Sequence, residues 1–264
     1  SCNRRSMANR QKIGLVLSGG GARGIAHLGV IKALEELGLQ VDILAGASAG
    51  SIAASLYAYG YTPERVLEII QSVSVFRSVK PAWTWMGLLS MEGLREVLLK
   101  HMPENNFAAL KKPVTVAATD IQQGLTVYYS EGELVGPIMA SCCVPAVFAP
   151  VQFGGRTLVD GGVLDNLPVT PIRQQCDFVI GSHCNPIGQH FDGKNLKSII
   201  ERSLLMAING NTIKSKEMCD ILIEPAGLEA FSGFELAKAR HIFEAGYEHV
   251  IRNFKRTDFP NQAA

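Results

Sequence analysis

The stretch VDILAGASAGSIAASLYAYG, residues 41–60, decides the fold of this 264-residue chain. Residues 41–45 have the character of a short buried strand, and the uncharged residues 49–59 that follow have that of a buried helix ending at Gly60. A strand that passes through a glycine-rich turn into a helix is the repeating unit of parallel sheets. The stretch therefore predicts an α/β protein with Ser48 on the turn between the two elements.

The rest of the chain continues this alternation of strands and helices, without repeats or a dividing linker. We expect a helix to start at Thr62-Pro63-Glu64, which supplies an N-cap, a proline at the first helical position and an acidic first turn. The pattern predicts a mostly parallel central sheet between helical layers. The other expected strands are 13–18, 113–119, 125–129, 147–153, 156–159, 178–182 and 221–224, and the other expected helices are 22–37, 92–101, 134–141, 196–216 and 234–254.

The domain organisation follows from the same survey. Residues 1–11 are basic and polar and lack the apolar run of a signal peptide. We expect them to be a disordered or added N-terminal segment outside the fold, and we expect residues 12–264 to form one domain.

Composition excludes several classes of protein. Hydrophobic residues make up 47% of the chain, so intrinsic disorder of its bulk is excluded. The 25 basic residues nearly balance the 24 acidic ones, and this lack of a basic excess argues against binding of nucleic acid. Two uncharged windows, 43–63 and 134–155, are long enough to span a membrane, but glycines interrupt the first and prolines the second. We interpret both windows as buried segments of the domain.

The six cysteines give no sign of a disulfide framework or a metal site. Cys142 and Cys143 are adjacent, and no CxxC pair or Cys/His cluster has the spacing of zinc ligands. We expect free thiols, no bound metal and a reducing compartment, which predicts a cytoplasmic protein.

The motif Gly46-Ala47-Ser48-Ala49-Gly50 has the G-x-S-x-G pattern of a nucleophile elbow. A serine on a sharp strand-to-helix turn presents its hydroxyl outside the sheet, and the two glycines Gly46 and Gly50 permit the tight backbone. The N-terminus of the following helix offers free N–H groups and a partial positive charge to an anionic intermediate. The alternative is an ordinary turn of small residues before a buried helix.

The glycine-rich segment Gly19-Gly20-Gly21-Ala22-Arg23-Gly24 lies between the first expected strand and helix. Backbone amides of Gly19, Gly20 and Gly21 are suited to an oxyanion hole, because no side chain covers them. The segment also satisfies the dinucleotide fingerprint G-x-G-x-x-G. That fingerprint requires an acidic residue at the far end of the second strand, whereas Asp42 lies at its start, which disfavours the dinucleotide hypothesis. A glycine turn that serves only packing remains a third interpretation.

The triplet Asp160-Gly161-Gly162 follows another expected strand, where a carboxylate could act as the general base for Ser48. An aspartate before two glycines is also ordinary turn chemistry. Among the six histidines only His183 follows a strand as a catalytic histidine would, so the sequence favours a Ser/Asp pair over a triad.

The three motifs, in this order, resemble the patatin-like phospholipases. The resemblance continues in Ala118-Thr119-Asp120, in Ala140-Ser141 through Phe148, and in Asn166-Leu167-Pro168, and it covers residues 13–254. It implies a three-layer αβα fold and a lipid acyl hydrolase that uses a Ser48–Asp160 dyad, an oxyanion hole at Gly19–Gly21 and no cofactor. Arg23, Gly24, Gly46, Gly50, Gly161 and Gly162 would then support the motifs. The chain resembles small bacterial members that consist of the catalytic core.

Several questions about activity stay open at this point. An acyltransferase would use the same serine, and a dinucleotide- or phosphate-binding module would use none. The expected partner is a lipid ester, and the segment 76–89, which contains Trp83 and Trp85, suits an interfacial lid making transient contact with a membrane surface. Alternatively the two tryptophans are part of the core. The oligomeric state stays open.

Overall fold

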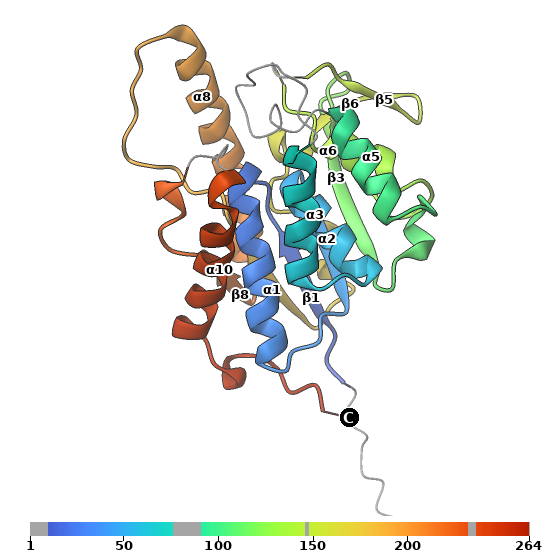
Figure 1. Cartoon of the computed structure of the whole chain (residues 1–264), viewed down its shortest axis with the longest axis vertical. Coiled ribbons are helices and arrows are strands. Elements are labelled where there is room, and N and C mark those ends of the chain that lie inside the picture. Colours follow the sequence, from blue (N-terminus) through green and yellow to red (C-terminus); the bar gives the residue numbers. More distant parts are fainter. Residues whose placement is uncertain (1–9, 76–90, 146–147, 232–235, 264) are drawn as a thin grey trace, which may run out of the picture.

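A single mixed sheet organises the chain (Figure 1). The computed structural model describes residues 10–75, 91–145, 148–231 and 236–263. Within these residues the sheet has eight strands in the order β5-β6-β3-β2-β1-β7-β8, and β4 also pairs with β3. The strands are β1 (Ile13–Leu17), β2 (Ile43–Ala47), β3 (Val114–Asp120), β4 (Leu125–Tyr129), β5 (Val151–Phe153), β6 (Arg156–Asp160), β7 (Phe178–Ser182) and β8 (Ile221–Ile223).

The sheet is parallel at its centre and antiparallel at one side. Strands β3, β2, β1, β7 and β8 pair in parallel, whereas β4 and β6 run antiparallel to β3 and β5 runs antiparallel to β6. The expectation of a mostly parallel central sheet is therefore confirmed.

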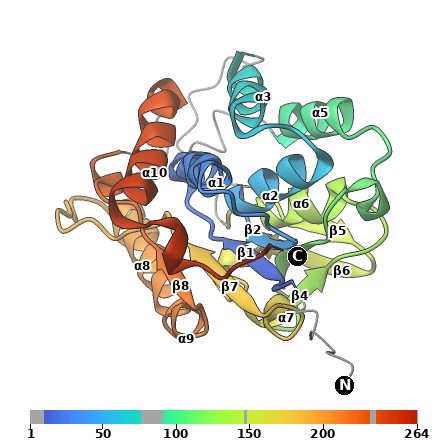
Figure 2. The same ribbon diagram turned by 90° about the horizontal axis from the view of Figure 1, so that it is seen from below.

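Helices cover both faces of this sheet (Figure 2). Helices α1 and α2 lie against one face with α3, α5 and α10 outside them, while α7 and α9 lie on the opposite side. This arrangement is the predicted three-layer α/β architecture. The helices are α1 (Ala26–Glu36), α2 (Ala49–Tyr59), α3 (Pro63–Val75), α5 (Met91–His101), α6 (Val135–Ser141), α7 (Thr170–Arg173), α8 (Leu196–Gly210), α9 (Ile213–Glu217) and α10 (Ala239–Asn253).

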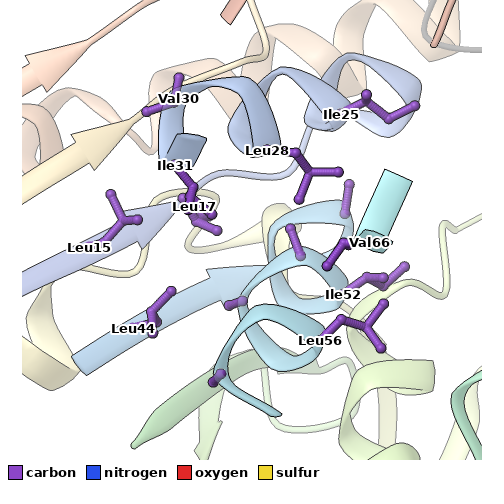
Figure 3. Packing of buried hydrophobic residues seen from close by; sticks show 14 of the residues in the cluster. Leu15, Leu17, Ile25, Leu28, Val30, Ile31, Leu44, Ile52, Leu56 and Val66 are labelled. Atoms are coloured by element: carbon purple, nitrogen blue, oxygen red, sulfur yellow. The ribbon is translucent and has the colours of Figure 1, made fainter. Parts of the chain in front are cut away.

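The central strands are buried on both faces, which explains their continuous apolar sequences. In β1, Leu15 and Leu17 pack into the larger core under α1 and α2, where Leu28 and Ile52 meet them (Figure 3). The intervening Val16 points to the other face and packs into the smaller core near α7. The alternation of side chains along a strand thus serves two cores at once.

Two expected elements differ from those observed. The predicted helix over 196–216 is divided into α8 and α9, because the side chain of Asn211 bonds to the backbone of residues 162, 163 and 166. The predicted strand over 147–153 begins only at Val151. The segment 76–89, expected to form a lid, lies outside the described residues, as do residues 1–9.

The two uncharged windows of the sequence form parts of the domain. Residues 43–63 contain β2 and α2, and residues 134–155 contain α6 and β5. In the part of the chain that the structure describes, each helix is either too short or too polar to cross a bilayer.

Two glycines allow α1 and α10 to cross in close contact. A Cβ atom on Gly29 of α1 would overlap the carbonyl oxygen of Phe243, and one on Gly246 of α10 would overlap the carbonyl oxygen of Ala26. The backbones of the two helices therefore approach each other without intervening side chains, which joins the C-terminal helix to the first βα unit.

We expect Gly29→Ala and Gly246→Ala each to lower the free energy of unfolding by about 1–3 kcal/mol, because the helices must separate to admit a methyl group. Gly210→Ala is the matched control, since a Cβ there meets no atom within 4 Å, and a helical alanine is favoured over glycine by up to ~1 kcal/mol. Urea unfolding of the three variants measures the difference. Equal stability of Gly29→Ala and Gly210→Ala would contradict the close crossing.

Candidate active site

Ser48 occupies a strained turn between β2 and α2. Its backbone has φ of 51° and ψ of −123°, a conformation that residues with a Cβ atom rarely adopt. The flanking glycines make the turn possible: a Cβ on Gly50 would overlap the carbonyl oxygen of Leu17 in β1, and a Cβ on Gly46 would lie 2.5 Å from the carbonyl carbon of Gly50. The structure thus places Ser48 on a strained, closely packed strand-to-helix turn.

Hydrogen bonds fix the backbone of Ser48 on both sides. Its N–H donates to the hydroxyl of Ser141 at 2.8 Å, and that hydroxyl donates to the carbonyl oxygen of Ala117 at 2.5 Å. Its carbonyl oxygen accepts bonds from the N–H and the hydroxyl of Ser51. We did not single out Ser141 as a site residue from the sequence. The available signal was a serine at the end of an otherwise apolar helix.

The register of the sheet brings Asp160 to the level of Ser48. Ala47 at the end of β2 pairs with Ala117 of β3, and the next residue of β3, Ala118, pairs with Asp160 of β6. The rule that sites form at the carboxyl ends of parallel strands does not explain this placement, because β6 runs antiparallel to β3. Asp160 reaches Ser48 because β3 lies between the two strands and aligns them.

The Asp160 carboxylate is buried and carries an altered pKa. Its Oδ1 accepts a hydrogen bond from the N–H of Gly162 at 2.7 Å, and the Ser48 side chain is close enough to the carboxyl to influence its pKa. Burial raises the pKa of Asp160 to about 6, although the Gly162 hydrogen bond and the nearby Ser48 side chain oppose the rise. The carboxylate is thus ionised at neutral pH but holds its proton far more readily than an exposed aspartate.

The glycine loop lies beside Ser48 and offers two free amides. A Cβ on Gly19 would lie 3.3 Å from Cβ of Ser48, so the loop passes directly next to the serine. The N–H of Gly19 already donates to the carbonyl oxygen of Asn166 at 3.2 Å. For the N–H groups of Gly20 and Gly21, the described residues provide no acceptor. Of the three predicted oxyanion donors, Gly20 and Gly21 are therefore available and Gly19 is occupied.

A buried histidine holds the start of the glycine loop. His27 Nε2 lies 2.7 Å from the carbonyl oxygen of Ser18, and Nδ1 lies 2.8 Å from the hydroxyl of Ser182. A carbonyl oxygen only accepts, so Nε2 carries the hydrogen and Nδ1 accepts from Ser182. Burial lowers the pKa of His27 to about 4, which keeps the ring neutral. Sequence reasoning missed this residue, although a histidine among apolar residues of a helix was a visible signal.

Arg23 and Gly24, the remaining residues named in the glycine motif, contact other parts of the chain. Arg23 Nε donates to the carbonyl oxygen of Phe231 at 2.9 Å, which ties the motif to the C-terminal part of the chain. Gly24 lies against Ala49, since a Cβ on it would be 2.6 Å from the alanine Cβ. Neither residue reaches the Ser48–Asp160 pair, so both serve the loop's position.

Two asparagines support the turn after Asp160. Asn211 Nδ2 donates to the carbonyl oxygen of Gly162 at 2.8 Å, and its Oδ1 accepts from the N–H of Asn166 at 3.0 Å. A Cβ on Gly161 would overlap the carbonyl oxygen of Ala117, so the turn fits closely over β3. Sequence analysis quoted Asn166 only within the resemblance and missed Asn211, which is remote in the chain.

The residues of the two alternative hypotheses, a catalytic histidine and a dinucleotide site, lie apart from the Ser48–Asp160 pair. His183 Nδ1 pairs with Glu224 Oε2 at 3.1 Å, and no described hydrogen bond joins His183 to Ser48. The carboxylate of Asp42 accepts from the N–H of Ile13 and from Arg10, at the amino end of the central strands. The acidic residue of a dinucleotide site would lie at their opposite end. A search of the described residues finds no group of three or more metal-ligating side chains.

We expect Asp160→Asn to raise stability at alkaline pH. The folded carboxyl has a pKa near 6 against 3.8 when unperturbed, so it stabilises the native state below pH 3.8 and loses this contribution as the pH rises through 6. The loss is on the order of 3 kcal/mol. Asparagine retains the acceptor without the charge, so the variant should exceed wild type in urea unfolding at pH 8 and approach it at pH 4. A variant no more stable than wild type at pH 8 would refute this account.

Comparison with known proteins places these motifs in a family. The family model described as patatin-like phospholipase matches residues 15–172. An uncharacterized NTE family protein of Mycobacterium tuberculosis is 35% identical over 163 residues, which are 61% of this chain and 45% of that protein. Lysophospholipase NTE1 of Kluyveromyces lactis is 27% identical over 271 residues, covering 90% of this chain and 19% of that protein.

The chain spans less than half the length of these relatives. Among solved structures, VipD from Legionella pneumophila aligns with 92% of this chain and 66% of that chain, at 16% identity and a TM-score of 0.49. The family model covers more than half of the residues and includes the glycine loop, Ser48 and Asp160. The chain therefore belongs to the patatin-like phospholipase family.

Proposed function

We propose that this chain hydrolyses acyl esters of lipids, with Ser48 as nucleophile and Asp160 as general base. The observation that carries the proposal is that the register of β2, β3 and β6 brings the buried Asp160 carboxyl to the level of Ser48, which occupies a strained turn beside the glycine loop. Family membership supports a lipid substrate, and the yeast relative is named a lysophospholipase. We extend that substrate class to this chain as part of the proposal.

The first half of the reaction forms an acyl-enzyme. Asp160 takes the proton of the Ser48 hydroxyl while Oγ attacks the ester carbonyl carbon, whose double bond opens to an oxyanion. The N–H groups of Gly20 and Gly21 and the N-terminus of α2 stabilise this negative charge. The oxyanion then collapses, the bond to the leaving alkoxide breaks, and the proton held on Asp160 passes to the departing oxygen.

The second half releases the fatty acid by the same groups. Asp160, ionised again, takes a proton from water as the water oxygen attacks the acyl carbon on Ser48. Collapse of the second oxyanion breaks the bond to Oγ, which recovers the proton from Asp160. A carboxylate with a pKa raised toward neutrality suits this double duty, because it is a stronger base than an exposed aspartate and still ionised at pH 7.

We expect Ser48→Ala to abolish both hydrolysis of a short p-nitrophenyl ester and labelling by a fluorophosphonate, because the activated hydroxyl is lost. Asp160→Asn should lower kcat/KM by at least about 10³-fold, since asparagine cannot accept the proton. A circular dichroism spectrum and a melting temperature establish that each variant is folded.

His183→Ala is the contrasting variant, because it removes a buried ring that has no described bond to Ser48. We expect a modest loss of activity at most. If His183→Ala were as inactive as Ser48→Ala while folded, a triad would replace the dyad. Product analysis with an added alcohol separates hydrolysis from acyl transfer, and normal turnover by folded Ser48→Ala would overturn the proposal as a whole.

The pH dependence of kcat/KM should report the ionisation of Asp160. Because the base must be deprotonated, activity should rise with pH through an apparent pKa of about 6 and remain level above it. With an unperturbed carboxyl, this rise in activity would occur near pH 4. A profile of the soluble ester between pH 4.5 and 8.5 measures it, with a circular dichroism spectrum at each pH as a check on the folded fraction. An acid limb near pH 4 would contradict the raised pKa.

A further inference from the structure

A narrow apolar cavity lies directly beside the candidate active site. Its walls come from the glycine loop, from one face of α2, and from α3 and α5, which pack over that face. Every lining side chain is aliphatic, so no lining side chain offers a hydrogen bond to a polar ligand. The lining includes Gly21, Ile25, Ala49, Ile52, Ala53 and Leu56.

One end of the cavity borders the candidate active site. Gly21 supplies one of the two free amides of the loop, and Ala49 directly follows Ser48. An ester whose carbonyl oxygen meets these amides therefore has its acyl carbon at the mouth of the cavity. The alkyl group on that carbon that enters the cavity contacts only aliphatic side chains.

The other end of the cavity lies along α2, away from Ser48. Ala49, Ile52, Ala53 and Leu56 recur at helical spacing and form one face of this helix. At 1.5 Å per residue, Leu56 is roughly 10 Å along the helix from Ala49. Figure 3 shows Ile52 and Leu56 on this face, with Ile25 across from them. The small side chain of Ala53 lies midway along this row.

The occupant must be apolar and thin. The cavity has about 20 Å³ of free space, little more than the minimum that holds one water molecule, and its side chains give a water no partner. Apolar cavities of this kind stay dry and take up apolar ligands. Longer occupants require the side chains of α3 and α5 to move away from α2.

We propose that this cavity binds the acyl chain of the ester substrate and that Ala53 and Leu56 set the chain length that the enzyme prefers. This inference rests on the function proposed above and specifies its substrate. The chain enters past Ala49, passes Ala53 and ends against Leu56. Burial of each methylene contributes about 0.8 kcal/mol, which corresponds to an increase of about fourfold in kcat/KM per methylene that the cavity accepts.

The test measures kcat/KM for p-nitrophenyl esters from butyrate to dodecanoate, each below its aggregation concentration. Ala53→Leu blocks the midpoint, so the ratio of decanoate to butyrate should fall by at least about tenfold. If Ala53→Leu does not fold, Ala53→Val narrows the same point with fewer atoms. Leu56→Ala extends the far end and should shift the preferred chain to greater length, by about fourfold per added methylene.

Leu67→Ala is the matched control for Leu56→Ala. Leu67 is equally buried and lies on α3, but it does not line the cavity. It should lower the melting temperature as Leu56→Ala does, and its chain-length profile should parallel that of wild type. A shift in Leu67→Ala equal to that in Leu56→Ala would mean that general loosening of the core sets the preference.

The outcomes separate this inference from the proposed function. Hydrolysis that depends on Ser48, together with unchanged chain-length profiles in Ala53→Leu and Leu56→Ala, overturns the acyl cavity and leaves the serine hydrolase intact. Hydrolysis that persists in Ser48→Ala overturns the function itself. A fall at long chains in Ala53→Leu with a shift to longer chains in Leu56→Ala supports both.

Discussion

The candidate site depends on the position of β3 between two strands of opposite direction. On one side β3 pairs in parallel with β2, which leads into Ser48, and on the other it pairs antiparallel with β6, which ends at Asp160. A slip of one residue in either pairing would turn the side chains of that strand to the other face of the sheet. Serine and carboxylate would then lie apart, so the proposed chemistry rests on this double register.

The residues that enforce the register also occupy backbone groups around the site. Ser141 joins the N–H of Ser48 to the carbonyl oxygen of Ala117 in β3, and Thr119 of β3 donates to the carbonyl oxygen of Asp160. Asn211 likewise occupies a backbone group of the turn beyond Asp160, because its Nδ2 donates to the carbonyl oxygen of Gly162. Because these backbone groups are satisfied, the amides left without described partners, those of Gly20 and Gly21, are free to meet an oxyanion.

Sequence reasoning located the local features of this site and missed the distant ones. Ser48 and the glycines around it carry their own signal, because a tight turn and close backbone approach require small residues at fixed spacing. Asp160 could be named as a candidate, but the antiparallel direction of β6 could not be foreseen, since no local pattern specifies how a strand pairs. The break at Asn211 was missed for a related reason: it arises from bonds to residues about 45–50 positions earlier, which outweigh the helical pattern of 196–216.

Helix α2 combines two properties that a site for lipid esters requires. Its N-terminus directs backbone N–H groups and a partial positive charge toward the carbonyl that Ser48 would attack. Its side carries the aliphatic row that begins at Ala49, so apolar surface starts within one residue of the nucleophile. The burial of Asp160 has a parallel consequence for the proposed chemistry, because loss of contact with water raises the pKa of its carboxyl to about 6 and makes it a stronger base than an exposed aspartate. A polar row along α2 would weaken the affinity for an alkyl chain.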